Sequence, residues 1–169
     1  DTQGDDVACG EVGEIWIQAP NLMQGYWQAP DHPAFQQGWF HSGDLARQDG
    51  EGFYWVGGRS TAMIISGGEN VYPAEVESAI YGHPAIAEVA VIGIPDDKWG
   101  EAVKAVCVPK PGAEIDEADV IAWARERIAG FKVPKSIDVI AALPRNASGK
   151  ILRKDLRAPY WEGRERQVN

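Results

Sequence analysis

The sequence predicts an α+β fold in two parts: a β-rich segment over residues 1–60, then a small domain of antiparallel or mixed sheet with flanking helices over residues 61–169. The first observation is a change of pattern at Met63. Short β-rich runs and turns precede it, and helical and strand patterns alternate after it. The second is a change of charge, because residues 1–60 hold nine acidic and only two basic side chains. The division predicts two units with different roles.

Length and composition restrict the class of protein. A chain of 169 residues with 44% hydrophobic and 24% charged residues is typical of a globular protein. Its net charge of −9 argues against a nucleic-acid partner. We find no apolar run long enough to span a membrane and no signal peptide, and the two cysteines lack metal-type spacing. We therefore expect no membrane span and a cytoplasmic location.

The first part is predicted to consist of strands and turns. In residues 14–18, two isoleucines flank a tryptophan with the period of a half-buried strand. Residues 53–56 form a second β-type run, after a tight turn at residues 48–52. Residues 21–33, with their glycine and prolines, are typical of a loop. A segment of this length and kind cannot easily close a hydrophobic core alone.

The second part begins with a predicted strand at residues 63–65 and a turn at residues 66–70. Pro73 suits the first position of a helix, and Gly82 suits the residue after its end. The remaining predicted elements are strands at 86–94, 102–108 and 137–141, a helix that Asp116 caps, and a short closing helix at 151–156.

Lys150 is the first candidate for chemistry. It follows Gly149 in the sequence Asn-Ala-Ser-Gly-Lys, which invites comparison with a phosphate-binding loop. However, Pro144 and Ile151 stand where that motif requires glycine and serine or threonine. Spacing alone leaves two interpretations, a solvated surface lysine or a movable positive charge for a phosphate group.

Asp44 and Arg59 form the second candidate. The Asp44 carboxylate follows Ser42 and Gly43, where it could either cap a turn or accept hydrogen bonds from the vicinal hydroxyl groups of a ribose. Arg59 would lie near Asp44 if the strands around them pair. An exposed arginine with no such neighbour is the alternative.

Two further features have weaker signals. The turn at residues 66–70 contains no basic side chain, so it would contact a phosphate only through backbone N–H groups, or it is an ordinary hairpin turn. His32, His41 and His83 lack the spacing of a metal site or a catalytic triad, and surface or capping roles are expected. No metal site is predicted.

The order of these motifs is more specific than any one of them. In series the chain contains GEIWIQAPNLMQGYW, GWFHSGDL, GFYWVGGRS, MIISGGENVYPAEVE, EVAVIGIPDDKWGE and LPRNASGKILRKDLR. Over nearly its whole length it resembles the carboxyl-terminal part of the adenylate-forming superfamily, in particular fatty-acyl and related acyl-CoA synthetases. The resemblance implies that residues 1–60 are the last β-rich subdomain of the large adenylation domain and that residues 61–169 are its mobile lid.

The resemblance also implies an acid–thiol ligase reaction in two steps. A carboxylic acid, here a fatty or related acid, would react with ATP and its Mg²⁺ to give acyl-adenylate, and the acyl group would then pass to coenzyme A. Asp44 would bind the ribose hydroxyl groups of AMP, and Arg59 the ribose and phosphate. Lys150 would be the catalytic lysine, placed at the α-phosphate and carboxylate oxygens. The pyrophosphate loop, the acyl pocket and most of the Mg²⁺ site belong to the rest of the adenylation domain, so the isolated chain is expected to be inactive.

Between the two steps the lid of this family rotates, and the resemblance implies a hinge at Thr61. The family usually has a charged residue there, whereas this chain has Ser60-Thr61-Ala62. We expect this departure to change the balance between the two lid poses. After rotation, the residues expected to face the pantetheine arm of coenzyme A are Ser66, Gly67, Gly68 and Glu69.

Two other functions stay open. One is an enzyme of the same superfamily that loads a carrier protein instead of coenzyme A, or that feeds an oxidation. The other is a non-catalytic interaction module. Substitution of Lys150 separates the module from both enzymes, because only the module would keep adenylation intact in the full-length protein.

Overall fold

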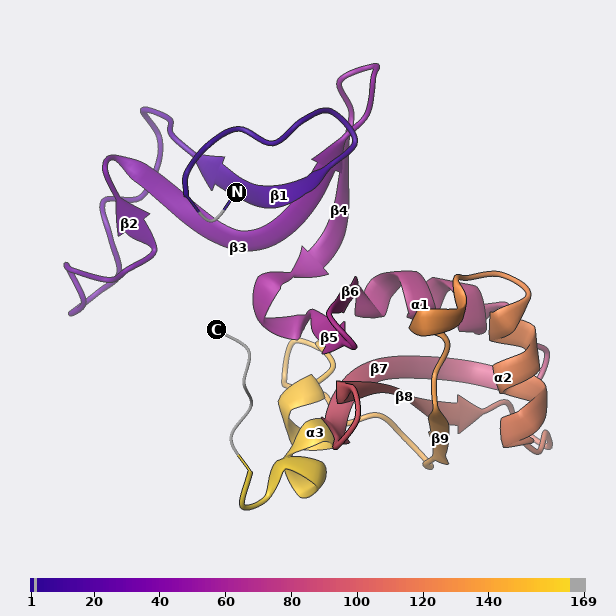
Figure 1. Ribbon diagram of the computed structural model, residues 1–169. Coiled ribbons are helices and arrows are strands. Elements are labelled where there is room, and N and C mark those ends of the chain that lie inside the picture. The colour runs from indigo at the N-terminus through magenta and orange to yellow at the C-terminus, as the bar shows by residue number, and fades with distance from the viewer. Residues whose placement is uncertain (2, 165–169) are drawn as a thin grey trace. The chain divides into compact units, whose positions relative to one another are not determined.

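The computed structural model describes residue 1 and residues 3–164. The chain forms two compact units, Asp1–Thr61 and a second that begins at Ala62 (Figure 1). In the first unit the regular elements are strands, with a single 3-10 turn at its end, and the second combines helices with a sheet. This content confirms the predicted α+β class.

The first unit is one antiparallel sheet of four strands, β1 (Val12–Ile17), β2 (Phe35–Gln36), β3 (Trp39–Gln48) and β4 (Tyr54–Arg59). The long strand β3 is central, because each of the other three pairs with it. The sequence patterns predicted β1 and β4 but not β3, since Gly43 and the polar residues around it conceal the strand. Asp44 therefore lies within a strand, and the turn-capping interpretation is wrong.

Little of the first unit is buried. Among its described hydrophobic residues only Ala46 is fully buried. Along β4, the side chains of Tyr54, Trp55 and Val56 are each more than half exposed. These exposures agree with the expectation that this segment does not close a core alone.

The second unit contains a five-stranded sheet, flanked by helices. Its strands are β5 (Ile64–Ser66), β6 (Glu69–Val71), β7 (Ile86–Asp96), β8 (Gly100–Pro109) and β9 (Ser136–Val139). Its helices are α1 (Pro73–Tyr81), α2 (Glu117–Arg125) and α3 (Arg153–Trp161). Strand β8 pairs antiparallel with β5 and β7 and parallel with β9, so the sheet is mixed, as predicted.

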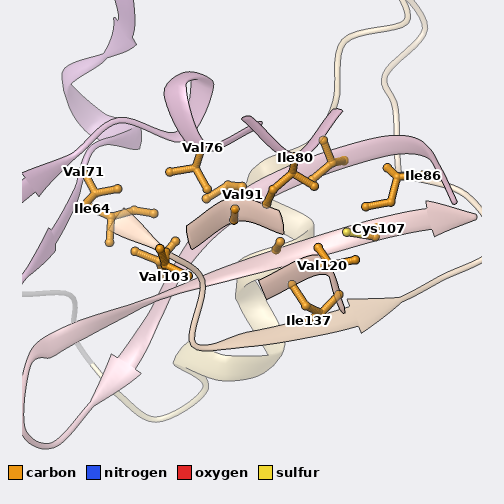
Figure 2. Packing of buried hydrophobic residues seen from close by; sticks show 14 residues of the cluster. Ile64, Val71, Val76, Ile80, Ile86, Val91, Val103, Cys107, Val120 and Ile137 are labelled. Atoms are coloured by element: carbon orange, nitrogen blue, oxygen red, sulfur yellow. The ribbon is translucent and has the colours of Figure 1, made fainter. Parts of the chain in front are cut away.

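The sheet has an apolar cluster on each face because its side chains alternate. Along β7, Val91 belongs to the cluster that includes Val76 and Ile80 of α1 and Val120 of α2, as Figure 2 shows. Its neighbour Ile92 belongs to the opposite cluster, with residues of α3 packed against it. Burial of each such valine or isoleucine stabilises the fold by about 1.5–3 kcal/mol.

Both helix predictions in the middle of the chain are confirmed. Helix α1 begins at Pro73 and is followed by Gly82, and the Asp116 side chain caps α2 by accepting a hydrogen bond from the Ala118 N–H (2.8 Å). Of the helices within the described residues, none is both long and apolar enough to cross a membrane.

The closing helix was predicted too early. Residues 151–156 were expected to be helical, but Ile151 forms a β-bridge with Arg145, and α3 starts at Arg153. It also continues past Pro159, which removes only one backbone donor and lies near the end of the helix. The segment that carries Lys150 is therefore a small hairpin, closed by the Leu152 N–H donating to the Pro144 carbonyl (2.8 Å).

Candidate functional site

Asp44 and Arg59 meet across two paired strands. They are direct partners in the antiparallel register of β3 and β4, and Arg59 Nη1 lies 3.3 Å from Asp44 Oδ1. The predicted juxtaposition is confirmed. Both side chains stay accessible, with 56% of Arg59 and 40% of Asp44 exposed. An exposed ion pair adds little stability, so its two groups can be rearranged around a ligand at small cost.

Gly43 makes room for this pair. Its φ of 74° favours glycine, and a Cβ atom at this position would lie 2.8 Å from Arg59 Nη2. The Gly43 N–H donates to Glu14 Oε1 (2.7 Å), while Glu14 Oε2 accepts from Trp16 Nε1 (3.0 Å). Sequence reasoning missed Glu14, because a side-chain contact between separate strands leaves no spacing signal.

The histidines have supporting positions rather than catalytic geometry. His32 Nδ1 accepts from the Ala34 N–H (3.1 Å), and His41 stacks on Trp16 with ring centroids 3.8 Å apart. Of the surface or capping roles expected for His83, the buried side chain excludes the surface role, and its contact after helix α1 fits the capping role. Its Nδ1 accepts from the Ala85 N–H (3.2 Å), so its Nε2 carries the proton toward Asp119 (3.1 Å). Within the described ranges, no three His, Cys, Asp or Glu side chains gather as metal ligands would.

The turn at residues 66–70 is a two-residue hairpin. Ser66 pairs with Glu69, and both Gly67 (φ 63°) and Gly68 (φ 86°) have the left-handed conformation of a type I′ turn. The Gly67 N–H donates to the Trp99 carbonyl (2.8 Å), and the Trp99 ring covers Gly67. A Cβ atom on Gly68 would meet no atom within 4 Å. One glycine is therefore packed against protein and the other is open to a ligand.

Lys150 lies exposed at the base of its small hairpin. Its backbone N–H donates to Asn146 Oδ1 (2.9 Å), and its carbonyl accepts from the Asn146 N–H (3.0 Å). Gly149, just before it, has a φ of 82°. The two hydrogen bonds to Asn146 thus fix the backbone of Lys150, while its side chain is exposed.

The Lys150 hairpin and the Ser66–Glu69 turn are attached at different positions along the antiparallel pair of strands β7 and β8. Ser66 pairs with Gly100, which is also the partner of Asp96 at one end of β7. The Lys150 hairpin is attached instead through an Arg145–Glu88 ion pair near the other end of β7. Asp96 lies eight residues after Glu88 along β7, a span of about 26 Å in an extended strand.

The fold and these residues resemble one class of protein, the carboxyl-terminal domain of enzymes that bind AMP. Residues 75–150 match the sequence profile of the AMP-binding enzyme C-terminal domain. A feruloyl-CoA synthase of an Amycolatopsis species is 52% identical over 93% of this chain and 32% of its own length. A medium/long-chain-fatty-acid–CoA ligase of Mycobacterium tuberculosis is 45% identical over 99% of this chain and 31% of its own.

A solved structure agrees with these relatives. The o-succinylbenzoate CoA synthetase of Bacillus subtilis, in complex with its acyl-adenylate intermediate, matches with a TM-score of 0.82 and 42% identity, over 89% of this chain and 31% of its own. This chain therefore belongs to the adenylate-forming superfamily and corresponds to a carboxyl-terminal part of its members. It spans about a third of the length of the curated relatives.

Proposed function

We propose that this chain is the carboxyl-terminal part of an ATP-dependent acyl-CoA ligase acting on fatty or related carboxylic acids in the cytoplasm. Residues 1–60 would belong to the large adenylation domain, and residues 61–169 would be the lid. The observation that carries the proposal is the separation of the Lys150 hairpin from the Ser66–Glu69 turn along β7 and β8. The two segments are attached at different positions along β7, and a two-step reaction in which the lid presents each segment in turn would use this separation.

In the first step a carboxylate oxygen of the acid attacks the α-phosphorus of ATP, and pyrophosphate leaves. Asp44 would accept hydrogen bonds from the ribose hydroxyl groups, with Arg59 beside it at the ribose and phosphate. Lys150 would place its ammonium group where negative charge gathers on the phosphate and carboxylate oxygens. Its exposed side chain on a fixed backbone suits this role.

In the second step the thiolate sulfur of coenzyme A attacks the acyl carbonyl carbon, and AMP leaves. The Ser66–Glu69 turn would then face the pantetheine arm. Gly68 supports this assignment, since the space where its side chain would lie is open. Trp99 would form one wall of the approach, because it already covers Gly67.

Magnesium would enter with ATP. The described residues contain no cluster of three or more candidate ligands, and the Asp44 carboxylate already has Arg59 as its partner. We assign none of the described side chains to the magnesium ion. The ion would be held mainly by residues of the rest of the adenylation domain.

Lys150→Ala in the full-length protein tests the proposed function. We expect ATP–pyrophosphate exchange to fall about 100-fold or more, because one preorganised charge at the transition state is lost. Thioester formation from supplied acyl-adenylate should be preserved. Lys154→Ala removes an exposed lysine of the same segment and serves as the matched control. Undiminished exchange in Lys150→Ala would instead identify a non-catalytic module.

The unmodified full-length protein also tests which thiol accepts the acyl group. Acyl-adenylate is supplied with either coenzyme A or a phosphopantetheinylated carrier protein, and product formation is followed by mass spectrometry. We expect coenzyme A to be the better acceptor, whereas transfer to the carrier alone would favour the carrier-loading enzyme. The isolated 169-residue chain should form no acyl-CoA, because it lacks the rest of the adenylation domain.

A further inference from the structure

Two arginine–glutamate pairs hold the hairpin that carries Lys150. On its first arm, Arg145 Nη1 donates to the Gly149 carbonyl (2.7 Å), and Nη2 pairs with Glu88 of β7. Just past its second arm, Arg153 Nη2 donates to both carboxylate oxygens of Glu77 on α1, at 2.7 and 2.8 Å. Each pair ties the hairpin to a different element of the same unit.

Glu77 connects three elements. Its Oε1 accepts from the Val91 N–H (2.8 Å) as well as from Arg153, so one carboxylate joins α1, β7 and the start of α3. Among the described strands β7 pairs only with β8, so it is an edge strand whose outward backbone groups need partners from elsewhere. Glu77 is 16% exposed and Arg153 34%, which shields this pair from solvent better than the Arg145–Glu88 pair.

The internal structure of the hairpin does not depend on the Glu77–Arg153 pair. Asn146 Oδ1 accepts from the N–H groups of Ser148 (3.1 Å) and Lys150 (2.9 Å), which closes the turn by itself. Arg153 therefore determines where the turn sits on the sheet rather than its shape, whereas Arg145 also contacts the Gly149 carbonyl inside the turn. This separates the position of Lys150 from its local fold.

We propose that Glu77 and Arg153 are positioning residues for Lys150, with Arg145 and Glu88 as a weaker second support. The proposal rests on the proposed function, in which Lys150 acts in adenylation. A lysine side chain loses much rotamer freedom when it is fixed on a substrate, so the location of its backbone decides whether the ammonium group reaches the reacting oxygens. Arg153 lies three residues after Lys150 and transmits the position of α1 and β7 to it.

The main test is Glu77→Gln in the full-length protein. Glutamine keeps an oxygen for the Val91 N–H but loses the charge and one of the oxygens that pair with Arg153. We expect kcat for ATP–pyrophosphate exchange to fall about 10- to 100-fold, with a smaller change in KM for ATP, as for a misplaced catalytic group. Thioester formation from supplied acyl-adenylate should not change, because that step does not use Lys150.

Further variants rank the contacts. Glu88→Gln should reduce exchange less than about fivefold, because its ion pair with Arg145 is more exposed. Arg153→Lys keeps the charge without the two-oxygen contact and should retain intermediate activity. The double variant Glu77→Gln/Arg153→Gln should lose no more than the worse single variant, since both act through one contact.

Glu75→Gln is the matched control. It removes the Glu75–Lys132 ion pair (2.6 Å) from the same helix without touching the hairpin, so exchange should be unchanged. Thermal unfolding of every variant shows whether the lid remains folded. Equal losses in both half-reactions, or full exchange activity in Glu77→Gln, would overturn the positioning role. Lys150→Ala distinguishes failure of the positioning role from failure of the proposed function, because only that variant tests whether Lys150 acts in adenylation.

Discussion

Gly67 and Gly68 share a turn but have different surroundings. Alanine at either position must adopt a left-handed conformation, which costs about 1–2 kcal/mol. At Gly67 the added Cβ would also lie 2.6 Å from Trp99 Cε3, and such overpacking costs about 1–3 kcal/mol more. We therefore expect Gly67→Ala to lower the free energy of unfolding more than Gly68→Ala, measured by urea denaturation. Equal losses would show that Trp99 moves aside freely.

At the scale of single residues, the sequence predicted the contact that follows from strand pairing. Arg59 was expected to lie near Asp44 only if the strands around them pair, and the antiparallel register of β3 and β4 supplies that pairing. Glu77 was not predicted to be functional. Its partner Arg153 is 76 residues away, and only the folded unit brings them together. The flanking arginines at positions 145 and 153 were the available signal, since fixed cations beside a candidate lysine need counter-charges.

At the scale of elements, α3 is held on the sheet by a polar cluster. The Tyr160 hydroxyl donates to Asp138 of β9, and the Lys104 ammonium group of β8 donates to the same carboxylate. Trp161 Nε1 donates to the Gly93 carbonyl on edge strand β7 (3.0 Å). Lys104 is almost fully buried, so loss of its counter-charge leaves an unpaired buried cation.

This cluster predicts acid sensitivity. Burial alone would raise the pKa of Asp138, but the hydrogen bonds from Lys104 and Tyr160 and the Lys104 charge outweigh it and lower the pKa. A lowered folded-state pKa gives stability that is present above the unfolded pKa of about 4 and is lost as pH falls through the folded value. In urea denaturation from pH 7 downward, Asp138→Asn should therefore show a smaller acid loss than the unmodified protein. Asp97→Asn, at an exposed carboxylate, should keep the full loss.

The same cluster predicts alkaline behaviour. Burial first, and then the hydrogen bond and charge of Asp138, raise the pKa of Tyr160 to about 12. The neutral phenol thus stabilises the fold below pH 10, and this contribution is lost as pH rises toward 12. In an absorbance titration, the Tyr160→Phe variant should show one fewer phenol that ionises as the pH rises from 10 toward 12. Loss of an ordinary tyrosine titration near pH 10 would contradict the prediction.

Elements were predicted best where one periodic pattern covers them. Helix α1 and strands β7 and β8 are regular apolar patterns bounded by proline or glycine. Strand β3 was missed because its glycine and polar residues belong to the candidate site rather than to a core. The start of helix α3 was predicted too early, because Ile151 pairs with Arg145 in a β-bridge and the contact from Arg153 to Glu77 is distant in sequence.

For the whole molecule, the division into units determines where motion can occur. The two compact units meet in the chain between Thr61 and Ala62, inside the 3-10 turn Ser60–Ala62. The hinge predicted from the resemblance falls at this boundary. In a short turn between two compact units, a few backbone torsions can change without disrupting the sheet of the first unit or the core of the second.

The last prediction concerns Thr61, the proposed hinge residue. A charged side chain at position 61 must find solvent or counter-charges in both lid poses, and any difference between them shifts their populations. We expect Thr61→Asp in the full-length protein to change the thioester half-reaction by about fivefold or more, within the range of ordinary conformational coupling, and adenylation less. The half-reactions are measured separately, by pyrophosphate exchange and by acyl transfer from supplied acyl-adenylate. Ser60→Asp adds the same charge one residue earlier, so a hinge-specific effect should be absent from it. Equal changes in both half-reactions would place the pivot elsewhere.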